Sequence, residues 1–430
     1  MRVLFVLPKR FHFDKNLLAK YTVWGETFDY VRRRCDVEAG LLDCDLGWVT
    51  QRHLIEQLVT RHHDVVVIWS ASVADVPASL EVCQLVKELS PETKVMVYGD
   101  GPIYAAKLFR HAGFDAIFSG GDPELAISSY LRHVSNPSSR GGAGRRVANV
   151  ELLVDGQYVA PGPPEITPPD QWGFPPIDAL PIDEYQAYYR NKYSHEKRLY
   201  PADVLSVTVS RGCTYRCHYC PTPLREGRND RRRPVDQLVV WLEGVAGRFS
   251  QVHLSSPIFT GDPLWVHEFC RALLDRGIQL QWRTTVRVDQ LDEPLVKLMA
   301  EAGCKTLLFG VETLYSERPE AAEKADVGQL AAASALLRRY GVRGKAFVML
   351  GMPGQLRADI LHTIATLRSM DLVVRPSGYT PLHHLHKMTV EELLQADLEQ
   401  YDKKSFYNPA MGLSKREFFQ LLLRNDPEER

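Results

Sequence analysis

The sequence lacks several features that would assign it to a simple class. None of its apolar runs approaches the roughly 20 residues that span a bilayer. The formal net charge is −1, so there is no bulk excess of basic residues for binding nucleic acid. We find no internal repeat, and the apolar N-terminus is short and has no secretory leader pattern. These absences argue against membrane-spanning, nucleic-acid-binding and exported proteins.

Cysteine is also scarce, with eight in 430 residues. Scattered single cysteines without a signal sequence are typically reduced core residues, so we expect a cytoplasmic protein without a disulfide framework. We also expect the protein to be a monomer. Three cysteines, in contrast, lie close together in sequence. The five scattered ones are Cys35, Cys44, Cys83, Cys270 and Cys304.

Apolar residues make up 45% of the chain and charged residues 24%, as in soluble globular proteins. The length predicts two domains with connecting segments. Over residues 1–134, apolar runs of strand length alternate with helix-like segments, which predicts a doubly wound α/β domain with a Rossmann-like parallel sheet. The expected strands are 3–7, 65–69, 94–99 and 115–121, and the expected helices are 51–62, 78–89 and 103–113.

Small or glycine-rich turns follow three of these strands. Open α/β sheets bind ligands at the carboxyl ends of their strands, and small residues let a large ligand approach the backbone. Any one such turn could merely reverse the chain, but three in register favour a ligand site. The turn residues are Ser70, Ala71, Ser72, Gly99, Asp100, Gly101, Ser119, Gly120 and Gly121.

Residues 135–201 are rich in proline, glycine and serine, which predicts a linker laid over the surface. A second alternation follows over 202–380 and predicts a partial barrel of about six β/α units, where a full barrel has eight. Residues 381–430 are expected to form a short helical cap. The expected strands are 204–210, 251–256, 280–287, 305–312, 345–351 and 373–378, and the helices are 235–249, 263–277, 294–303, 328–341 and 356–370.

The three clustered cysteines Cys213, Cys217 and Cys220 lie in RGCTYRCHYCPTP (211–223), directly after the first barrel strand. This places three thiolates at the carboxyl end of the barrel, where such barrels perform chemistry. Three thiolates at this spacing suit an iron–sulfur cluster or zinc. A closed zinc site normally has four ligands, and His218 is the one candidate for a fourth. Three ligands on a four-iron cluster leave one iron open.

This motif, Cys-x3-Cys-x-aromatic-Cys after a first strand, resembles the radical S-adenosylmethionine (SAM) superfamily. The resemblance implies a [4Fe–4S] cluster whose open iron chelates SAM and cleaves it to a 5′-deoxyadenosyl radical. Tyr219 holds the aromatic place near the adenine. By the same match Arg287 faces the SAM carboxylate, Glu312 meets its ribose or amino group, and Gly351 shapes the adenine-side turn. Where many relatives carry acidic residues after the second strand, this sequence has Ser255 and Ser256.

The first domain is similar to the cobalamin-binding domain of one branch of that superfamily, most clearly over residues 97–127. The resemblance implies that the three turns hold the corrin edge and nucleotide tail of cobalamin. The Asp-x-His-x-x-Gly motif that supplies a cobalt ligand elsewhere is absent, and His12, His62 and His63 lack its spacing.

These features together predict a cobalamin-dependent radical SAM methyltransferase that acts on a small-molecule or peptide substrate. Family analogy implies that the deoxyadenosyl radical activates a substrate carbon, methylcobalamin donates the methyl group, and a flavodoxin or ferredoxin supplies electrons. One alternative is a radical SAM enzyme of this architecture that cyclises, oxidises or rearranges its substrate. A second is a maturation or binding protein with a structural cluster. The basic run 227–234 is expected to be a solvated loop, and the histidines of 383–388 to be cap residues.

Overall fold

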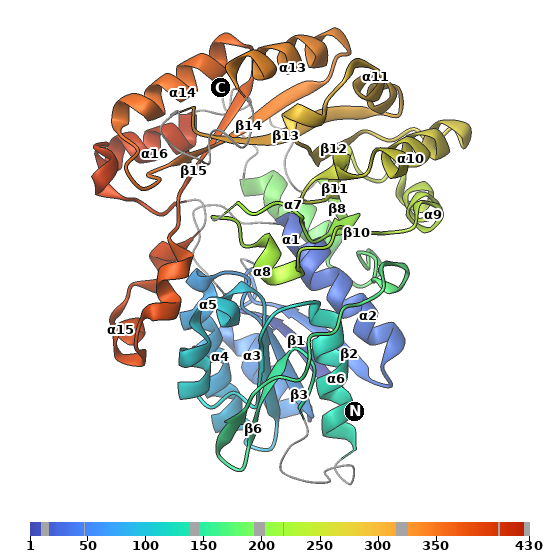
Figure 1. The fold of residues 1–430 in the computed structure, drawn as a ribbon. Coiled ribbons are helices and arrows are strands. Elements are labelled where there is room, and N and C mark those ends of the chain that lie inside the picture. The colour runs from blue at the N-terminus through green and yellow to red at the C-terminus, as the bar shows by residue number, and fades with distance from the viewer. Residues whose placement is uncertain are drawn as a thin grey trace.

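The computed structural model describes residues 1–9, 17–46, 48–136, 146–192, 203–217, 219–314, 326–402 and 405–424. Two α/β units are joined end to end, with the N-terminal unit at the bottom of Figure 1 and the partial barrel at the top. No helix in these ranges is long and apolar enough to cross a membrane. His12 and His218 lie outside the described residues.

The N-terminal unit is built on a seven-stranded sheet of order β2-β1-β3-β4-β5-β6-β7. The first five strands pair in parallel, and β3 is buried along its whole length because helices cover both faces, as the apolar runs predict. The parallel strands are β1 (Arg2–Leu7), β2 (Glu38–Asp43), β3 (Val65–Trp69), β4 (Lys94–Tyr98) and β5 (Ala116–Phe118). Their helices are α3 (Gln51–Thr60), α4 (Val76–Leu89), α5 (Asp100–His111) and α6 (Pro123–Ser135).

The structure corrects part of the predicted linker over 135–201. Two strands within it, β6 (Val150–Val154) and β7 (Gln157–Val159), pair antiparallel with β5 and with each other and so extend the first sheet. The turn between them, Asp155-Gly156, has positive φ angles and resembles the turns that close tight hairpins. Because the segment as a whole is rich in proline, its sequence predicts a linker and gives no sign of this short hairpin. Proline-rich chain does run on through 161–181, and α7 (Ile182–Lys192) follows it.

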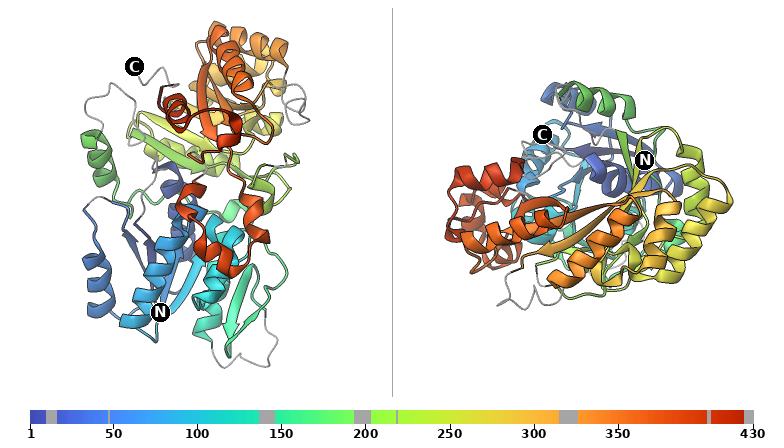
Figure 2. Two further views of the ribbon diagram at one scale, coloured as in Figure 1. Left: turned by 90° about the vertical axis from the view of Figure 1, so that its left-hand side faces the viewer. Right: turned by 90° about the horizontal axis from the view of Figure 1, so that it is seen from above.

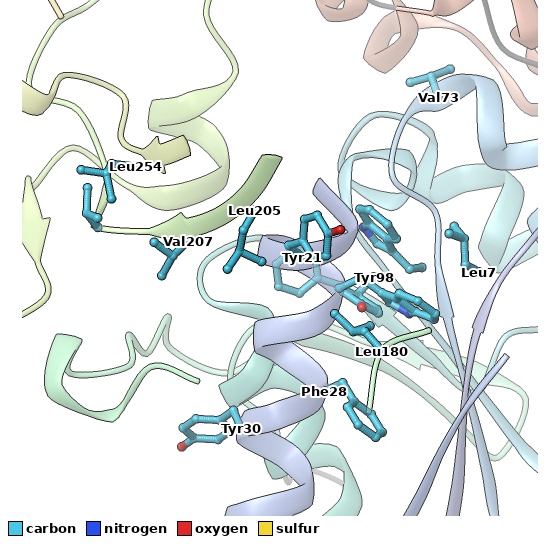
Figure 3. Packing of buried hydrophobic residues seen from close by; sticks show 14 of the residues in the cluster. Leu7, Tyr21, Phe28, Tyr30, Val73, Tyr98, Leu180, Leu205, Val207 and Leu254 are labelled. Atoms are coloured by element: carbon cyan, nitrogen blue, oxygen red, sulfur yellow. The ribbon is translucent and has the colours of Figure 1, made fainter. Parts of the chain in front are cut away.

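No element is predicted from the sequence over residues 8–50, and the structure has a helical segment and β2 within this range. The helix runs through α1 (Leu17–Ala19), a π-helical stretch (Lys20–Glu26) and α2 (Thr27–Arg34). In Figure 1 this segment begins between the two units at α1 and continues as α2 along the N-terminal unit. Figure 3 shows Tyr21 of this segment with Leu205 of the barrel on one side and Tyr98 of the first sheet on the other. All three belong to one buried apolar cluster, so this helix gives the two units a shared apolar core.

The second unit is a six-stranded parallel sheet of order β8-β11-β12-β13-β14-β15, with each strand next to the following one. This confirms the predicted partial barrel of six β/α units. The strands are β8 (Val204–Thr208), β11 (Gln251–Ser255), β12 (Trp282–Thr285), β13 (Cys304–Glu312), β14 (Arg343–Leu350) and β15 (Val373–Gly378). The covering helices are α9 (Val235–Val245), α10 (Pro263–Asp275), α11 (Glu293–Glu301), α13 (Val327–Arg339) and α14 (Arg357–Ser369).

The C-terminal segment crosses back to the first unit. Its helices are a 3-10 segment (Leu382–Lys387), α15 (Val390–Gln395), two further short 3-10 turns (Leu398–Tyr401, Pro409–Met411) and α16 (Lys415–Arg424). Figure 2 shows this segment running down beside the N-terminal unit before it returns to the barrel. Lys107 of α5 donates to the carbonyl oxygens of His386 and Met388, and the His386 ring lies 5.4 Å from that of Tyr104. The predicted cap therefore ties the two units together.

Candidate functional site

The three cysteines lie on the loop after β8 and a short strand, β9 (Ser210–Arg211), at the carboxyl end of the barrel. Gly212 has a φ of 84°, and a Cβ there would lie 2.0 Å from the carbonyl oxygen of Asn229, so this position requires glycine. The backbone N–H of Cys213 donates to Gly227, and that of Cys220 donates to Cys217. The loop is thereby folded back on itself, with Cys213, Cys217 and Cys220 all half-buried and none in a disulfide.

All three cysteines line one pocket of about 320 Å³, which we call the cysteine pocket. Burial raises the pKa of Cys213, and the nearby thiols of Cys220 and Cys217 raise it further, which shows that the three sulfurs share one environment. Within the described ranges, no three His, Cys, Asp or Glu side chains converge on a position for a single metal ion. Three thiols that line one cavity fit an iron–sulfur cluster as their ligand.

Tyr219 and Glu312 face each other in the same pocket. The Tyr219 hydroxyl donates to Glu312 Oε1 over 3.4 Å, and burial together with the charge of Glu312 raises the pKa of Tyr219. Glu312 is 6% exposed and has a φ of 64°, a conformation that residues other than glycine rarely adopt. Strained backbone of this kind is concentrated at ligand sites. A buried carboxylate here is suited to bind a cationic or hydroxyl group of a ligand.

Arg287 also lines the cysteine pocket. Its guanidinium donates to both oxygens of Asp289, at 3.0 and 2.7 Å, and lies 4.1 Å above the Tyr215 ring. Burial lowers its pKa, but the bond to Asp289 outweighs this and the net shift is upward. The side chain is therefore held in place and charged at the rim of the pocket.

Three residues that the family resemblance places on the SAM side of the barrel do not line the cysteine pocket. Ser255 and Ser256 line a neighbouring cavity, and the Ser256 and Ser210 hydroxyls are 2.6 Å apart. Gly351 does not line the cysteine pocket. It has a φ of 84°, its N–H donates to Gln355, and its carbonyl accepts from the Asn408 side chain. Gly351 thus shapes the turn after β14 and contacts the C-terminal segment.

The neighbouring cavity, of about 460 Å³, lies between the two units, and we call it the interdomain cavity. Trp69, Tyr98 and Phe118, which end three adjacent strands of the first sheet, form its apolar wall. The Tyr98 hydroxyl is buried and has no hydrogen-bond partner among the described residues. An aromatic wall at the carboxyl ends of parallel strands, with an unsatisfied hydroxyl, fits a large flat ligand with polar edges.

Five of the nine turn residues predicted to hold cobalamin line this cavity: Ala71, Ser72, Gly99, Asp100 and Gly121. Ser70, Gly101, Ser119 and Gly120 do not. Ser70 lies behind the wall, where its side chain would be 2.1 Å from a Cβ at Gly101, and its carbonyl oxygen 2.2 Å from one at Gly99. Those two glycines are therefore required by the packing of the chain itself.

The turns of the first unit meet the cysteine loop directly. Helix α8 (Thr222–Glu226) begins two residues after Cys220, and the carbonyl oxygen of Arg225 accepts from the N–H of Gly121. The Arg225 guanidinium bonds to Glu226 and lies 3.6 Å from Asp100. Burial lowers the pKa of Arg225, but these carboxylates outweigh it and raise the pKa overall. Asp100 and Arg225 therefore join the two predicted ligand sites.

The prediction of a solvated loop over 227–234 is right for residues 227–230, which are exposed, but wrong for the arginines that follow them. Arg231 lies 2.5 Å from Asp122, and Arg232 donates to the carbonyl oxygens of Phe259 and Ile258. Arg233 is fully buried and donates to the carbonyl oxygens of Thr208, Trp172 and Gly173. Burial lowers the pKa of Arg233 to about 10. The run was misjudged because its carboxylate partner comes from residues more than 100 positions earlier.

Comparison with known proteins gives one family match. Residues 207–367 match the model of the radical SAM superfamily. Among curated proteins, an uncharacterised methyltransferase of Pyrococcus horikoshii is 24% identical over 199 residues, which is 46% of this chain and 42% of that protein. The cytidylyl-2-hydroxyethylphosphonate methyltransferase of Streptomyces wedmorensis is 28% identical over 146 residues, covering 32% and 27%. The chain thus spans less than half the length of these relatives.

Two solved structures have a similar fold over most of the chain. The radical SAM methyltransferase TsrM of Kitasatospora setae, solved with tryptophan and a SAM analogue, has a TM-score of 0.70 at 17% identity, covering 89% of this chain and 75% of that one. The cobalamin-dependent SAM radical enzyme OxsB, solved with aqua-cobalamin, has a TM-score of 0.67 at 15% identity, covering 94% and 57%. At such identity the likeness concerns the fold alone.

Proposed function

We propose that this chain, whose residues 207–367 match the radical SAM superfamily, is a cobalamin-dependent radical SAM methyltransferase. The observation that carries the proposal is the arrangement of its two cavities. Thr222, Pro257 and Thr285 line both the cysteine pocket and the interdomain cavity, so the two adjoin at a shared wall. A SAM-derived radical and a second cofactor bound in these cavities would face the same substrate.

In this proposal, Cys213, Cys217 and Cys220 hold a [4Fe–4S] cluster in the cysteine pocket and leave one iron for SAM. Glu312, held by Tyr219, binds the amino or ribose end of SAM, and Arg287 faces its carboxylate. The charges of the pocket are thus opposite in sign to those of the ligand at each end. When bound, the cluster and SAM supply a 5′-deoxyadenosyl radical and cobalamin supplies a methyl group.

The interdomain cavity would hold cobalamin against Trp69, Tyr98 and Phe118. Its carboxyl-end position and the small side chains of Ala71 and Ser72 let a wide ligand lie close to the backbone. Ser255 and Ser256 line this cavity from the barrel side, so we assign them to cobalamin or substrate instead of SAM. The cytidylyl-hydroxyethylphosphonate and tryptophan named for similar proteins support a small-molecule substrate. A flavodoxin or ferredoxin would supply the electron.

The test uses the full chain reconstituted with iron, sulfide and hydroxocobalamin, and then incubated with SAM and a low-potential reductant. We expect iron–sulfur and corrinoid absorption, with both 5′-deoxyadenosine and S-adenosylhomocysteine formed. Cys217→Ser should abolish the cluster absorption and the deoxyadenosine, because two cysteines do not hold the cluster. Cys35→Ser, at a half-buried cysteine remote from the pocket, is the matched control and should change neither.

A separate variant tests corrinoid binding. Tyr98→Phe removes the unsatisfied hydroxyl of the cavity wall and should weaken corrinoid binding without affecting the cluster. Tyr130→Phe, at a buried tyrosine of α6 outside the cavity, is the control. Deoxyadenosine without S-adenosylhomocysteine, in protein that takes up no corrinoid, would favour a rearrangement, oxidation or cyclisation instead. An intact cluster that forms no deoxyadenosine would rule out both enzymatic proposals.

A further inference from the structure

The short helix α8 forms part of the wall of both cavities. Thr222, at its start, lines the cysteine pocket and the interdomain cavity, and Arg225 and Glu226, at its end, line the interdomain cavity. In Figure 1 this helix lies between the two units. It begins two positions after Cys220, one of the three proposed cluster ligands. A displacement of α8 would therefore change the shape of both cavities.

This helix depends on what holds its two ends. It is five residues long, and isolated helices shorter than about 12 residues are marginal in water. At its C-terminal end, Glu226 Oε2 accepts from the Gly212 N–H at 3.1 Å, and the carbonyl oxygen of Gly227 accepts from the Cys213 N–H at 3.2 Å. At its N-terminal end the chain leads directly to Cys220. A cluster bound to Cys213 and Cys220 would thus fix α8 at both ends.

Arg225 connects α8 to the first unit. Its guanidinium donates to Glu226 Oε1, at 2.9 and 2.5 Å, and lies 3.6 Å from Asp100 Oδ1 at the start of α5. Its carbonyl oxygen accepts from the Gly121 N–H at 3.1 Å. Asp100 and Gly121 belong to two of the turns that line the interdomain cavity. These contacts join the turns, through Arg225 and Glu226, to the residue before the first cysteine.

Two other arginines also tie the cysteine loop to the first unit, but they lie deeper. Arg211 pairs with Glu124 and Arg231 pairs with Asp122, and their side chains are 10% and 9% exposed. The Arg225 side chain is 31% exposed and lines the interdomain cavity. The two buried pairs hold the ends of the loop whatever the cavity contains. Arg225 is the most exposed of the three, so a ligand in the cavity can contact it.

We propose that Arg225 couples the two cofactor sites, so that a cluster on the three cysteines raises the affinity of the interdomain cavity for a corrinoid. The inference rests on the proposed function, because it takes both cofactors as bound in these cavities. Ordering α8 costs conformational freedom, and a cluster that has already fixed this helix leaves a corrinoid less to order. By linkage, a bound corrinoid strengthens the binding of the cluster by the same factor. Arg225 acts through Asp100 and Glu226 and is therefore a positioning residue.

The experiment measures the dissociation constant for cyanocobalamin by equilibrium dialysis, in the full chain with and without the reconstituted cluster. We expect the cluster to tighten binding about 5-fold or more, the lower end of typical coupling between sites. Arg225→Met removes the contacts of the guanidinium with Asp100 and Glu226, so it should lower the ratio of the two dissociation constants toward one. Arg110→Met, at an arginine paired with Glu151 outside both cavities, is the matched control and should keep the wild-type ratio.

A second measurement needs no cluster-free protein. The release of cluster iron to a chelator is followed with and without cyanocobalamin. The corrinoid should slow this release in wild type and in Arg110→Met, but not in Arg225→Met. A purely structural role for Arg225 would lower the melting temperature and leave both comparisons as in wild type. Circular dichroism shows which variants are folded, and Asp100→Asn, which removes the same ion pair from the other side, replaces Arg225→Met if that variant does not fold.

Two outcomes overturn the inference and leave the proposed function standing. One is an equal affinity for cyanocobalamin with and without the cluster, and the other is a ratio that Arg225→Met leaves unchanged. If neither form binds cyanocobalamin, the proposed cobalamin site and this inference both fail. The formation of deoxyadenosine and S-adenosylhomocysteine, measured on the same samples, reports on the proposed function separately. Coupled binding without these products counts against the proposed function alone.

Discussion

Arg211 and Glu124 form an ion pair across the boundary between the two units, at 2.5 Å, with both side chains almost fully buried. Arg211 lies two residues before Cys213, and its guanidinium also lies 3.6 Å from Glu26 and 4.5 Å from the centre of the Trp172 ring. Burial lowers the pKa of Arg211, but the surrounding carboxylates outweigh it and raise the pKa overall. The start of the cysteine loop is thus anchored to the N-terminal unit.

Replacing Arg211 should lower the free energy of unfolding substantially. Arg211→Met keeps most of the volume but leaves Glu26 and Glu124 buried without their shared cation. Breaking a buried pair on one side costs about 3–5 kcal/mol. We expect a loss of this size in the free energy of unfolding, measured with urea. Arg276→Met, which removes an exposed arginine, should change it by less than about 0.5 kcal/mol. A loss that small in Arg211→Met would show that the interface does not depend on the pair.

Asp122 gives the interface a dependence on pH. It begins α6, accepts from the Thr167 N–H at 2.6 Å and bonds to Arg231. Burial raises its pKa, but Arg231 and Arg211 outweigh this and hold it below the usual 3.8. A carboxyl with a depressed pKa stabilises the fold above its unfolded pKa, and this stability is lost as pH falls through the folded pKa.

The measurement compares the unfolding free energies of wild type and Asp122→Asn from pH 7 downward. At pH 7 the variant should be less stable by about 3 kcal/mol, because Arg231 and Arg211 lose a buried anion. The difference in unfolding free energy between the two proteins should begin to narrow below about pH 5, because the unfolded wild type binds protons that the folded protein does not. Glu26, whose pKa burial raises, is present in both proteins. If the difference in unfolding free energy widens as the pH falls, the pKa of Asp122 is not depressed in the folded protein.

The alternation of strands with helices identified the middle of the barrel, because β11, β12, β13 and β14 are each followed by a helix of nine or more residues. The cysteine pocket followed from local spacing and the family resemblance, since Cys213, Cys217, Cys220 and Tyr219 are neighbours in the chain. The hairpin at 150–159 was missed because its strands are too short to stand out from a proline-rich background.

The interface was the least predictable part. Arg211 and Glu124 are 87 positions apart, and Arg231 and Asp122 are 109 apart, so no local pattern connects them. The helical segment over 17–34 buries Lys20 and Glu26, which a composition-based reading places in solvent. Lys20 is in fact held by Asp43 and Asp45, at 2.8 and 3.2 Å. Long-range partners of this kind are visible only once the fold is known.

A substitution at Gly351 tests whether this glycine is required for the turn conformation or for SAM binding. Its φ of 84° disfavours any side chain, and a Cβ there would lie 3.3 Å from Asn408 and 3.4 Å from Met411. Gly351→Ala should therefore reduce stability by about 1–2 kcal/mol and leave the dissociation constant for SAM unchanged. Gly341→Ala has a similar φ of 66° and no atom within 4 Å, so it should show the conformational cost alone. Weaker SAM binding in a stable Gly351→Ala protein would show that this turn contacts the ligand as well.

Glu312 offers the sharpest test of the SAM pocket. Glu312→Gln keeps the size of the side chain and an oxygen to accept from Tyr219, but removes the one negative charge that the barrel strands bring to the cysteine pocket. A charge-assisted hydrogen bond contributes about 1.5–3 kcal/mol, so the dissociation constant for SAM should rise about 10-fold or more. Equilibrium dialysis of the cluster-loaded protein measures this directly. Glu301→Gln, at an exposed carboxylate of α11 near Lys297, is the matched control and should bind SAM as wild type does. Because cluster absorption reports the cysteines independently, an unchanged SAM affinity with the cluster intact would remove Glu312 from the site while leaving the cysteine assignment standing.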